Sequence, residues 1–353
     1  MAAASEALPT TLITGFLGSG KTTLLNGLLA HPGMADTAVI INEFGEIGLD
    51  HLLIESAFED AVLLKSGCIC CTVRGDLVDT MGGLIERRDR GEIPHFSRVA
   101  IETTGLADPA PILHTIMGDP KLQSLYRVDR VVTTVDAANA LSQLDTHYEA
   151  AKQAALADRL VLTKTDLVSH EERERVLARL VALNPLAPVI VVVQGKVSPE
   201  TLFALDPPSL ALRQDRLAAA EALGDDHDHG HDHGDDHEDA AEHLARHHGI
   251  STVSLVREEP VEWPRLRSWL TALASLKGPD LLRVKGIINV AGRPGPVVIH
   301  GVQHVFHPPV ELKAWPDADR RSRLVFITRN IKAEALARSF TAAMTEGARV
   351  SFP

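Results

Sequence analysis

Short runs of β-branched and aliphatic residues recur along the N-terminal part of the chain, with helical patterns between them. The first run, residues 10–14, precedes leucines at helical spacing, namely Leu24, Leu25, Leu28 and Leu29. Strands that alternate with helices predict an α/β fold with a doubly wound, largely parallel sheet covered on both faces. Further runs that predict strands fall at residues 37–41, 61–64, 98–101, 130–136, 159–162 and 188–193.

The C-terminal part of the chain carries a different pattern. Residues 250–256 alternate apolar and polar positions as a half-buried strand does, and residues 263–276 predict a helix. The sequence therefore predicts a small α+β domain after the parallel sheet. Its other expected elements are strands at 281–290, 297–306 and 324–328 and a helix at 332–344.

An acidic, histidine-rich segment separates the two patterns. Between Asp225 and His248 it holds eight of the chain's 17 histidines, nine acidic residues and one arginine. This composition cannot bury a core, so we expect a disordered linker. Imidazoles beside carboxylates favour loose, multivalent binding of Zn²⁺, Ni²⁺ or Co²⁺, and a purely solubilising linker is the alternative. The expected domains are residues 8–206, a linker over 207–249 and a C-terminal domain over 250–353.

Composition narrows the class of protein. The 353 residues are 45% hydrophobic with a mean hydropathy of +0.03. No apolar run approaches the roughly 20 residues of a membrane helix, so we expect a cytoplasmic protein with no signal peptide and no membrane partner. The net charge of −12 argues against a nucleic-acid partner, and the linker carries −8 of it, which leaves the folded parts nearly balanced.

The stretch that begins at Gly15 satisfies the pattern G-x-x-x-x-G-K-[ST] between an expected strand and an expected helix, the context that a phosphate-binding loop requires. Its glycines allow backbone N–H groups and a helix N-terminus to converge on phosphates. Lys21 would place its charge near the β- and γ-phosphates of a nucleotide, and the Thr22 hydroxyl would bind a phosphate-bound Mg²⁺. The expected phosphate-binding residues are Gly15, Gly18, Ser19, Gly20, Lys21, Thr22 and Thr23.

Further polar loops follow expected strands, where the functional loops of a nucleotide-binding sheet lie. Glu102 ends one strand and is placed to hold Mg²⁺, and Gly105 follows within reach of the γ-phosphate. Thr163, Lys164 and Asp166 follow another strand. The Asp166 carboxylate can accept hydrogen bonds from the ring N–H and the amino group of guanine, a pattern that adenine does not offer, so we expect GTP rather than ATP. Lys21 and Glu102 are the expected catalytic residues, and the general base is unassigned.

All three cysteines lie in one short stretch, at Cys68, Cys70 and Cys71. An odd, tight cluster in a chain without an export signal favours metal binding or redox chemistry over disulfides. Thiolates suit Zn²⁺ or Cu(I), and three of them leave a tetrahedral ion one ligand short. Water, Glu43, Glu46 or a client protein would complete an exchangeable site. Because the stretch follows the expected strand at 61–64, we place it at the sheet edge that carries the phosphate loop.

Together these motifs resemble those of the CobW-like family of P-loop GTPases, which includes zinc metallochaperones and proteins linked to cobalamin synthesis. The resemblance covers nearly the whole chain. Thr163 departs from the asparagine that many GTPases carry at this point. The motifs that carry the resemblance are GFLGSGKTT at 15–23, NEFGE at 42–46, GCICC at 67–71, ETTGLADP at 102–109, TKTD at 163–166, the His-rich linker and LLRVKGIINV at 281–290.

The resemblance implies slow GTP hydrolysis coupled to the delivery of a metal, usually zinc, to a client metalloprotein. By motif it assigns Mg²⁺ to Thr22 and Glu102 and the transferred ion to Cys68, Cys70 and Cys71. Two alternatives stay open: a protein that stores or senses metal with GTP as a regulator, and a GTPase that inserts cobalt or nickel. The sequence is also compatible with a homodimer, and it names no client.

Overall fold

The structure is a computed structural model that describes residues 7–42, 62–63, 69–73, 77–203, 248–316 and 318–345. The chain divides into two compact units, residues 1–176 with 188–205 and residues 177–187 with 206–353. Glu46, Cys68 and nearly all of the expected linker lie outside the described residues. Across the described ranges, no helix is long and apolar enough to cross a bilayer.

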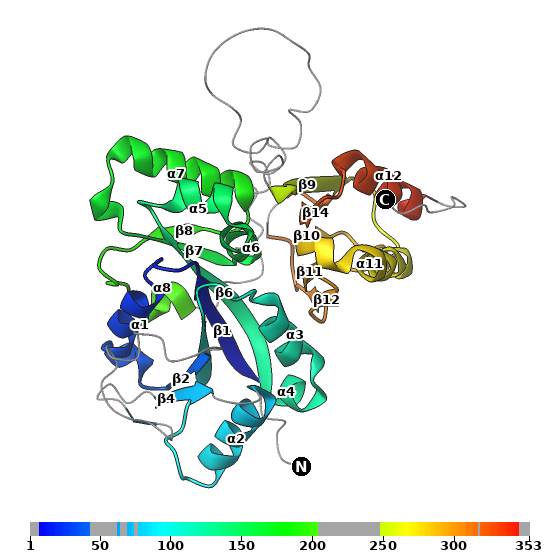
Figure 1. Cartoon of the computed structure of the whole chain (residues 1–353). Coiled ribbons are helices and arrows are strands. Elements are labelled where there is room, and N and C mark those ends of the chain that lie inside the picture. The colour runs from blue at the N-terminus through cyan, green and yellow to red at the C-terminus, as the bar shows by residue number, and fades with distance from the viewer. Residues whose placement is uncertain are drawn as a thin grey trace. The chain divides into compact units, whose positions relative to one another are not determined.

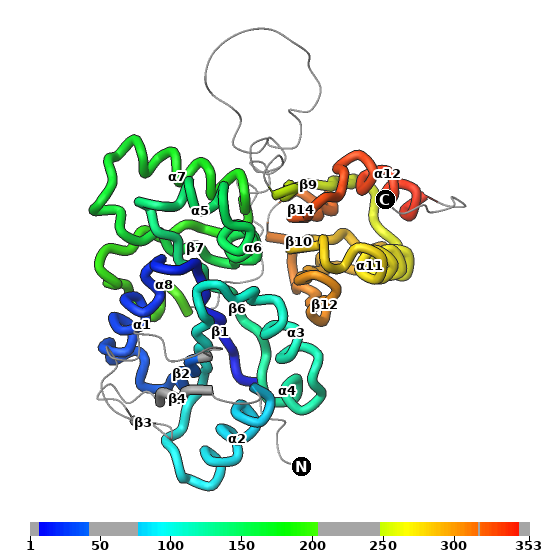
Figure 2. Tube along the Cα trace, in the orientation of Figure 1, coloured from blue at the N-terminus to red at the C-terminus, as the bar shows by residue number. Residues whose placement is uncertain are grey.

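An eight-stranded sheet is the framework of the first unit (Figure 1). Its strand order is β3-β4-β2-β5-β1-β6-β7-β8, and all neighbours pair in parallel except β3 and β4. The predicted doubly wound, largely parallel sheet is thus confirmed. Figure 2 shows β1 beside β6, although the two strands are far apart in the sequence. The strands are β1 (Leu8–Gly15), β2 (Thr37–Asn42), β3 (Val62–Leu63), β4 (Ile69–Val73), β5 (Arg98–Thr103), β6 (Tyr126–Asp136), β7 (Arg159–Thr163) and β8 (Val189–Val191).

The short strand β3 differs from what the sequence predicts for residues 61–64. It runs antiparallel to β4, with Val62 opposite Cys70. The predicted placement at the phosphate-loop edge is wrong for Cys70 and Cys71, which belong to a strand and not to a loop that follows one. Cys68 lies outside the described residues. Cys70 and Cys71 lie inside β4, opposite Val39 and Ile40 of β2.

Helices cover both faces of this sheet. On one face, Leu24 of α1 and Phe203 of α8 pack in a core with alternate strand residues such as Val132. Successive strand residues point to opposite faces, so Thr133, next to Val132, points to the other face. There its hydroxyl donates a 2.9 Å hydrogen bond to the carbonyl of Gln153 on α6. The helices are α1 (Lys21–Leu29), α2 (Leu77–Asp89), α3 (Ala110–Gly118), α4 (Pro120–Leu125), α5 (Ala140–Thr146), α6 (Tyr148–Leu156), α7 (His170–Leu183) and α8 (Pro199–Phe203), with 3₁₀ turns η1 (Pro32–Met34) and η3 (Thr165–Leu167).

A second sheet and two helices form the core of the C-terminal part, as predicted. The sheet is antiparallel with the order β12-β11-β10-β14-β9, and β13 pairs with β11. Trp269 centres the core, because its ring meets the rings of Phe326 and Phe340 edge-on and its Nε1 donates to the Ser339 hydroxyl at 3.3 Å. The elements are β9 (Ile250–Arg257), α11 (Trp263–Lys277), η4 (Gly278–Asp280), β10 (Leu281–Ile288), β11 (Val297–Val302), β12 (Val305–Phe306), β13 (Val310–Glu311), β14 (Ser322–Arg329) and α12 (Ala333–Met344).

Candidate nucleotide-binding site

The stretch from Gly15 to Lys21 forms a tight loop between β1 and α1. Gly15 has φ +147°, and a Cβ there would lie only 2.2 Å from the Thr134 hydroxyl oxygen of β6, so no side chain fits. Gly20 caps α1 with φ 90°, a left-handed conformation that glycine adopts without strain. The backbone N–H of Ser19 donates to the carbonyl of Phe16 at 3.1 Å and closes the turn. The local geometry is that of a phosphate-binding loop at a helix N-terminus.

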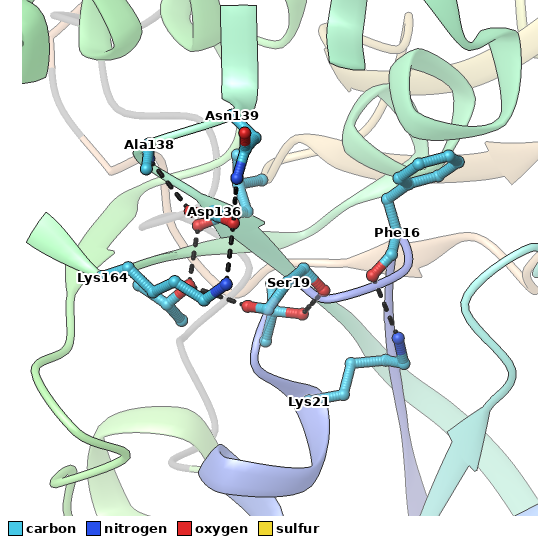
Figure 3. Close-up of polar contacts among 10 residues, drawn as sticks. Phe16, Ser19, Lys21, Asp136, Ala138, Asn139 and Lys164 are labelled. Atoms are coloured by element: carbon cyan, nitrogen blue, oxygen red, sulfur yellow. Dashed lines mark hydrogen bonds and ion pairs between the residues drawn. The ribbon is translucent and has the colours of Figure 1, made fainter. Parts of the chain in front are cut away.

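The ammonium of Lys21 lies within the curve of this loop (Figure 3). Its Nζ donates to the carbonyl oxygens of Gly15 at 2.8 Å and Phe16 at 3.2 Å, and the residue is only 9% exposed. The side chain is therefore held by the loop itself, with its charge where a phosphate group would approach. Next to it, Thr22 is half-buried and Thr23 is exposed in the first turn of α1.

Hydroxyl groups from two neighbouring strands hold the phosphate loop in place. The Ser19 hydroxyl lies 2.6 Å from that of Thr134 on β6. The Thr163 hydroxyl lies 2.7 Å from the Ser19 carbonyl oxygen and 3.1 Å from that of Val135, so its single hydrogen is shared between two acceptors. Thr163, the departure from the usual asparagine, thus ties the end of β7 to the phosphate loop.

Lys164 is fixed by a carboxylate that the sequence analysis did not single out. Its backbone is left-handed, with φ 54° and ψ 30°, and its Nζ donates to Oδ2 of Asp136 at 2.8 Å (Figure 3). Asp136 ends β6 and is 1% exposed. It also accepts hydrogen bonds from the N–H of Ala138 at 3.0 Å and from the amide of Asn139 at 2.8 Å. This set of donors holds the buried carboxylate in place.

The loop that follows β5 lies against the phosphate loop. Glu102 is 8% exposed and lies opposite Ile13 of β1. Ile13 is two residues before Gly15, where the phosphate loop begins. The Thr103 hydroxyl donates to that of Thr14 at 2.9 Å. A Cβ on Gly105 would lie 2.9 Å from the backbone nitrogen of Leu17, so only glycine fits this contact.

The structure brings most of the predicted nucleotide site together. The phosphate loop adjoins Glu102 and Gly105 of the β5 end on one side and Thr163 of the β7 end on the other. Asp166 is exposed in the turn η3, which follows Lys164 directly.

The predicted metal site is described only in part. Cys70 and Cys71 belong to β4, whereas Cys68 and Glu46 lie outside the described residues. Among the described residues, no group of three or more His, Cys, Asp or Glu side chains could hold a metal ion. The predicted ligand set therefore stays a prediction.

Two residues near the phosphate loop were not singled out from the sequence, Asp136 and Gln153 of α6, and only the first carries a recognisable signal. Asp136 is an acidic residue at the end of a buried strand, the same feature that singled out Glu102. Gln153 carries no such signal, because a glutamine in a helix is usually a surface residue. Its role depends on contacts that only the folded chain makes.

Known proteins match both parts of the chain. The model of the CobW/HypB/UreG nucleotide-binding domain matches residues 9–191. The chain belongs to the CobW/HypB/UreG family. It is therefore a GTPase, and its phosphate loop and parallel sheet fit a nucleotide-binding domain. The model of the cobalamin synthesis protein CobW C-terminal domain matches residues 250–344, which coincide with the antiparallel sheet and its two helices.

Relatives in the CobW/HypB/UreG family match almost end to end. The chain is 32% identical over 330 residues to the zinc chaperone YjiA of Escherichia coli, which covers 94% of this chain and 96% of that protein. It is 31% identical to the zinc chaperone CobW of Pseudomonas aeruginosa, over 96% of this chain and 92% of the other. The crystal structure of Zn(II)-bound YjiA GTPase from E. coli is similar with a TM-score of 0.71 and 29% identity, over 96% of this chain and 100% of that one.

Proposed function

We propose that this GTPase is a zinc metallochaperone that carries one zinc ion on Cys68, Cys70 and Cys71 and hands it to a client metalloprotein under the control of GTP. The observation that carries the proposal is the likeness to the zinc chaperone YjiA, which extends over more than nine-tenths of both chains. The Zn(II)-bound structure of that relative supports zinc as the cargo. Three thiolates and an open fourth position suit an ion that must leave again.

The nucleotide roles follow the contacts around the phosphate loop. Backbone N–H groups of the loop would bind the phosphates, and Lys21, already held inside the loop, would neutralise the charge that develops on the transferred phosphoryl group. Gly105 would contact the γ-phosphate. Thr163 and Lys164 would shape the guanine site, and the exposed Asp166 carboxylate would accept hydrogen bonds from guanine.

The residues around Glu102 fit a Mg²⁺ ion. A carboxylate only 8% exposed stands at the end of β5 beside the phosphate loop, and the Thr22 hydroxyl follows the loop lysine. Oxygen donors of this kind are the ones that Mg²⁺ prefers. When bound, Mg²⁺ supplies positive charge to the phosphate oxygens, and Thr22 and Glu102 are the residues that would hold it.

The strand β2 provides the route by which nucleotide and metal would affect each other. Ile40 is opposite Cys71 of β4 on one side and Ile101 of β5 on the other, and Ile41 is opposite Glu102. β2 ends at Asn42, where the acidic segment that includes Glu46 begins. Coupling through β2 replaces the shared sheet edge that the sequence analysis expects, and Glu46 keeps its proposed place as an extra zinc ligand.

The stoichiometry of zinc binding tests the proposal. Protein that lacks residues 225–248 should keep one tightly bound zinc ion, and a variant with Cys70→Ser and Cys71→Ser should lose it. The His-rich composition of the linker favours a second function, metal storage, which predicts several ions per chain that are all lost with the linker. Parallel titrations with Co²⁺ and Ni²⁺ decide whether the cargo is zinc or one of those ions.

A further inference from the structure

The loop between β5 and α3 is fastened to α6 by one buried glutamine. The Nε2 of Gln153 donates to the carbonyl oxygen of Gly105 at 3.1 Å and to that of Ala107 at 2.9 Å. Gln153 is 1% exposed. A single amide group therefore holds the carbonyl groups of the two residues that flank Leu106.

The chemistry of the amide fixes its orientation. Only the NH₂ end can serve two carbonyl oxygens at once, because the reverse orientation would place the amide oxygen against two other acceptors. The Oε1 of Gln153 has no hydrogen-bond partner among the described residues. Gln153 also lines a small cavity together with Phe16 of the phosphate loop and with Thr133 and Thr134 of β6. A buried amide that leaves its acceptor unpaired costs stability, so a compensating role is expected of it.

The neighbouring residue of α6 makes a second attachment. Lys152 Nζ lies 2.6 Å from the Oδ2 of Asp108, and the lysine side chain is only 12% exposed. The other carboxylate oxygen of Asp108 accepts a 3.0 Å hydrogen bond from the N–H of Ala110, at the start of α3. The loop is therefore held to α6 at Gly105, Ala107 and Asp108.

The same helix also contacts the phosphate loop. His147, which immediately precedes α6, stacks its ring on that of Phe16, with ring centres 4.7 Å apart and an interplanar angle of 25°. Gly105 in turn packs against the backbone of Leu17, the residue that follows Phe16 in the phosphate loop. A displacement of Gly105 relative to the phosphate loop thus requires the bonds from Gln153 to break.

We propose that Gln153 is a positioning residue for GTP hydrolysis: it holds Gly105 at the γ-phosphate and so makes the site respond to a triphosphate more than to a diphosphate. This rests on the proposed contact between Gly105 and the γ-phosphate. In the part of the chain that the structure describes, no hydrogen bond joins Gln153 to the residues that would bind guanine or the other phosphates, so its loss should leave GDP binding largely intact.

The variant Gln153→Met tests the proposal, because methionine fills a similar volume and removes both donors. The matched control is Gln143→Met. Gln143 lines the same cavity from α5, and no side-chain hydrogen bond joins it to the loop in the described structure. A second variant, Lys152→Met, loosens the loop at its other attachment. Each protein is assayed for kcat and KM with GTP, for the Kd of GDP and of a non-hydrolysable GTP analogue, and for amide hydrogen exchange at residues 104–108.

We expect Gln153→Met to lower kcat and the affinity for the analogue by roughly tenfold or more, with faster exchange at residues 104–108, since two buried hydrogen bonds are lost. The affinity for GDP should change by less than about twofold, Gln143→Met should behave as wild type, and Lys152→Met should show a smaller loss in the same direction.

Two results would overturn the positioning role while the proposed function stands: unchanged kcat in Gln153→Met despite faster exchange, or equal losses for GDP and the analogue. Wild-type protein that binds GDP and the analogue equally would instead contradict the γ-phosphate contact at Gly105, and the positioning role with it.

Discussion

The ammonium of Lys164 lies 2.8 Å from the Oδ2 of Asp136, a carboxylate that is 1% exposed at the end of the neighbouring strand. The ion pair joins β6 to the segment that we propose recognises guanine, and Asn139 and Ala138 donate to the same carboxylate. Lys164 is partly exposed whereas Asp136 is buried, so the carboxylate holds the lysine in place at the surface of the site.

The substitution Asp136→Asn should therefore weaken GTP recognition. We expect the KM for GTP to rise by roughly tenfold and the preference for GTP over ATP to fall, since a hydrogen bond to a charged group is lost. Steady-state hydrolysis with both nucleotides measures this. The control is Asp129→Asn, at a carboxylate near the start of β6 whose side chain is 9% exposed and pairs with Arg130. Identical nucleotide preference in Asp136→Asn and wild type would refute the anchoring role.

Replacement of the loop lysine should nearly abolish turnover. Lys21→Ala removes the charge that the carbonyls of Gly15 and Phe16 hold in the phosphate loop, and losses of roughly a hundredfold or more in kcat are typical of such groups. Lys121→Ala, at an exposed lysine of α4 that pairs with Glu86, should have no effect.

Wild-type protein should turn over GTP in preference to ATP. Equal turnover of ATP and GTP would contradict the role assigned to Asp166.

Deletion of residues 225–248 should leave folding and GTP turnover intact, because the segment has too little apolar content to pack. The capacity for loosely bound metal should fall by several ions per chain. Thermal unfolding, turnover and metal content of the shortened and full-length proteins give the comparison. A large drop in Tm would contradict the expected disordered linker.

A pH-dependent contribution to stability is expected from the C-terminal sheet. Hydrogen bonds from the side chain and the backbone N–H of Arg321, together with the positive charge of Arg323, hold the pKa of Asp319 below its usual range. A carboxyl with a lowered pKa in the folded state stabilises the fold above its unfolded-state pKa, and this contribution is lost as the pH falls through the folded-state value.

Asp319→Asn should thus lower Tm at pH 7, and the difference from wild type should narrow as the pH falls below about 4. Thermal unfolding across this range, followed by circular dichroism, measures the narrowing. If the difference in Tm between wild type and Asp319→Asn stayed constant with pH, the charge of Asp319 would not be the source of that difference.

The sequence predicted features that depend on local pattern. The phosphate loop required only glycine spacing between a strand and a helix, and the buried runs at residues 98–101 and 159–162 were long enough to indicate parallel strands. The direction of β3 escaped prediction, because two residues carry no periodicity and their pairing partner is chosen by the folded sheet. Gln153 escaped for a similar reason, since only tertiary structure brings it within 3.1 Å of the Gly105 carbonyl.

The strand β2 lies between the strand that carries Cys70 and Cys71 and the strand that carries Glu102, and so connects the proposed zinc site with the proposed nucleotide site. Cys71 and Ile101 are both opposite Ile40, so the cysteine strand and the Glu102 strand share one neighbour. If γ-phosphate contacts alter the β5 loop, and β2 transmits the change, then GTP must change zinc affinity. Zinc must change GTP affinity by the same factor, because linkage is reciprocal.

Zinc competition against a chromophoric chelator with GTP, with GDP and without nucleotide is the most direct measurement of this coupling. It is made on protein that lacks residues 225–248, so that the histidines do not mask the tight site. We expect a shift in zinc affinity of roughly 5- to 150-fold between the nucleotide states, abolished in a Cys70→Ser, Cys71→Ser variant that still binds GTP. Identical zinc affinities in all three states would contradict GTP-controlled zinc delivery.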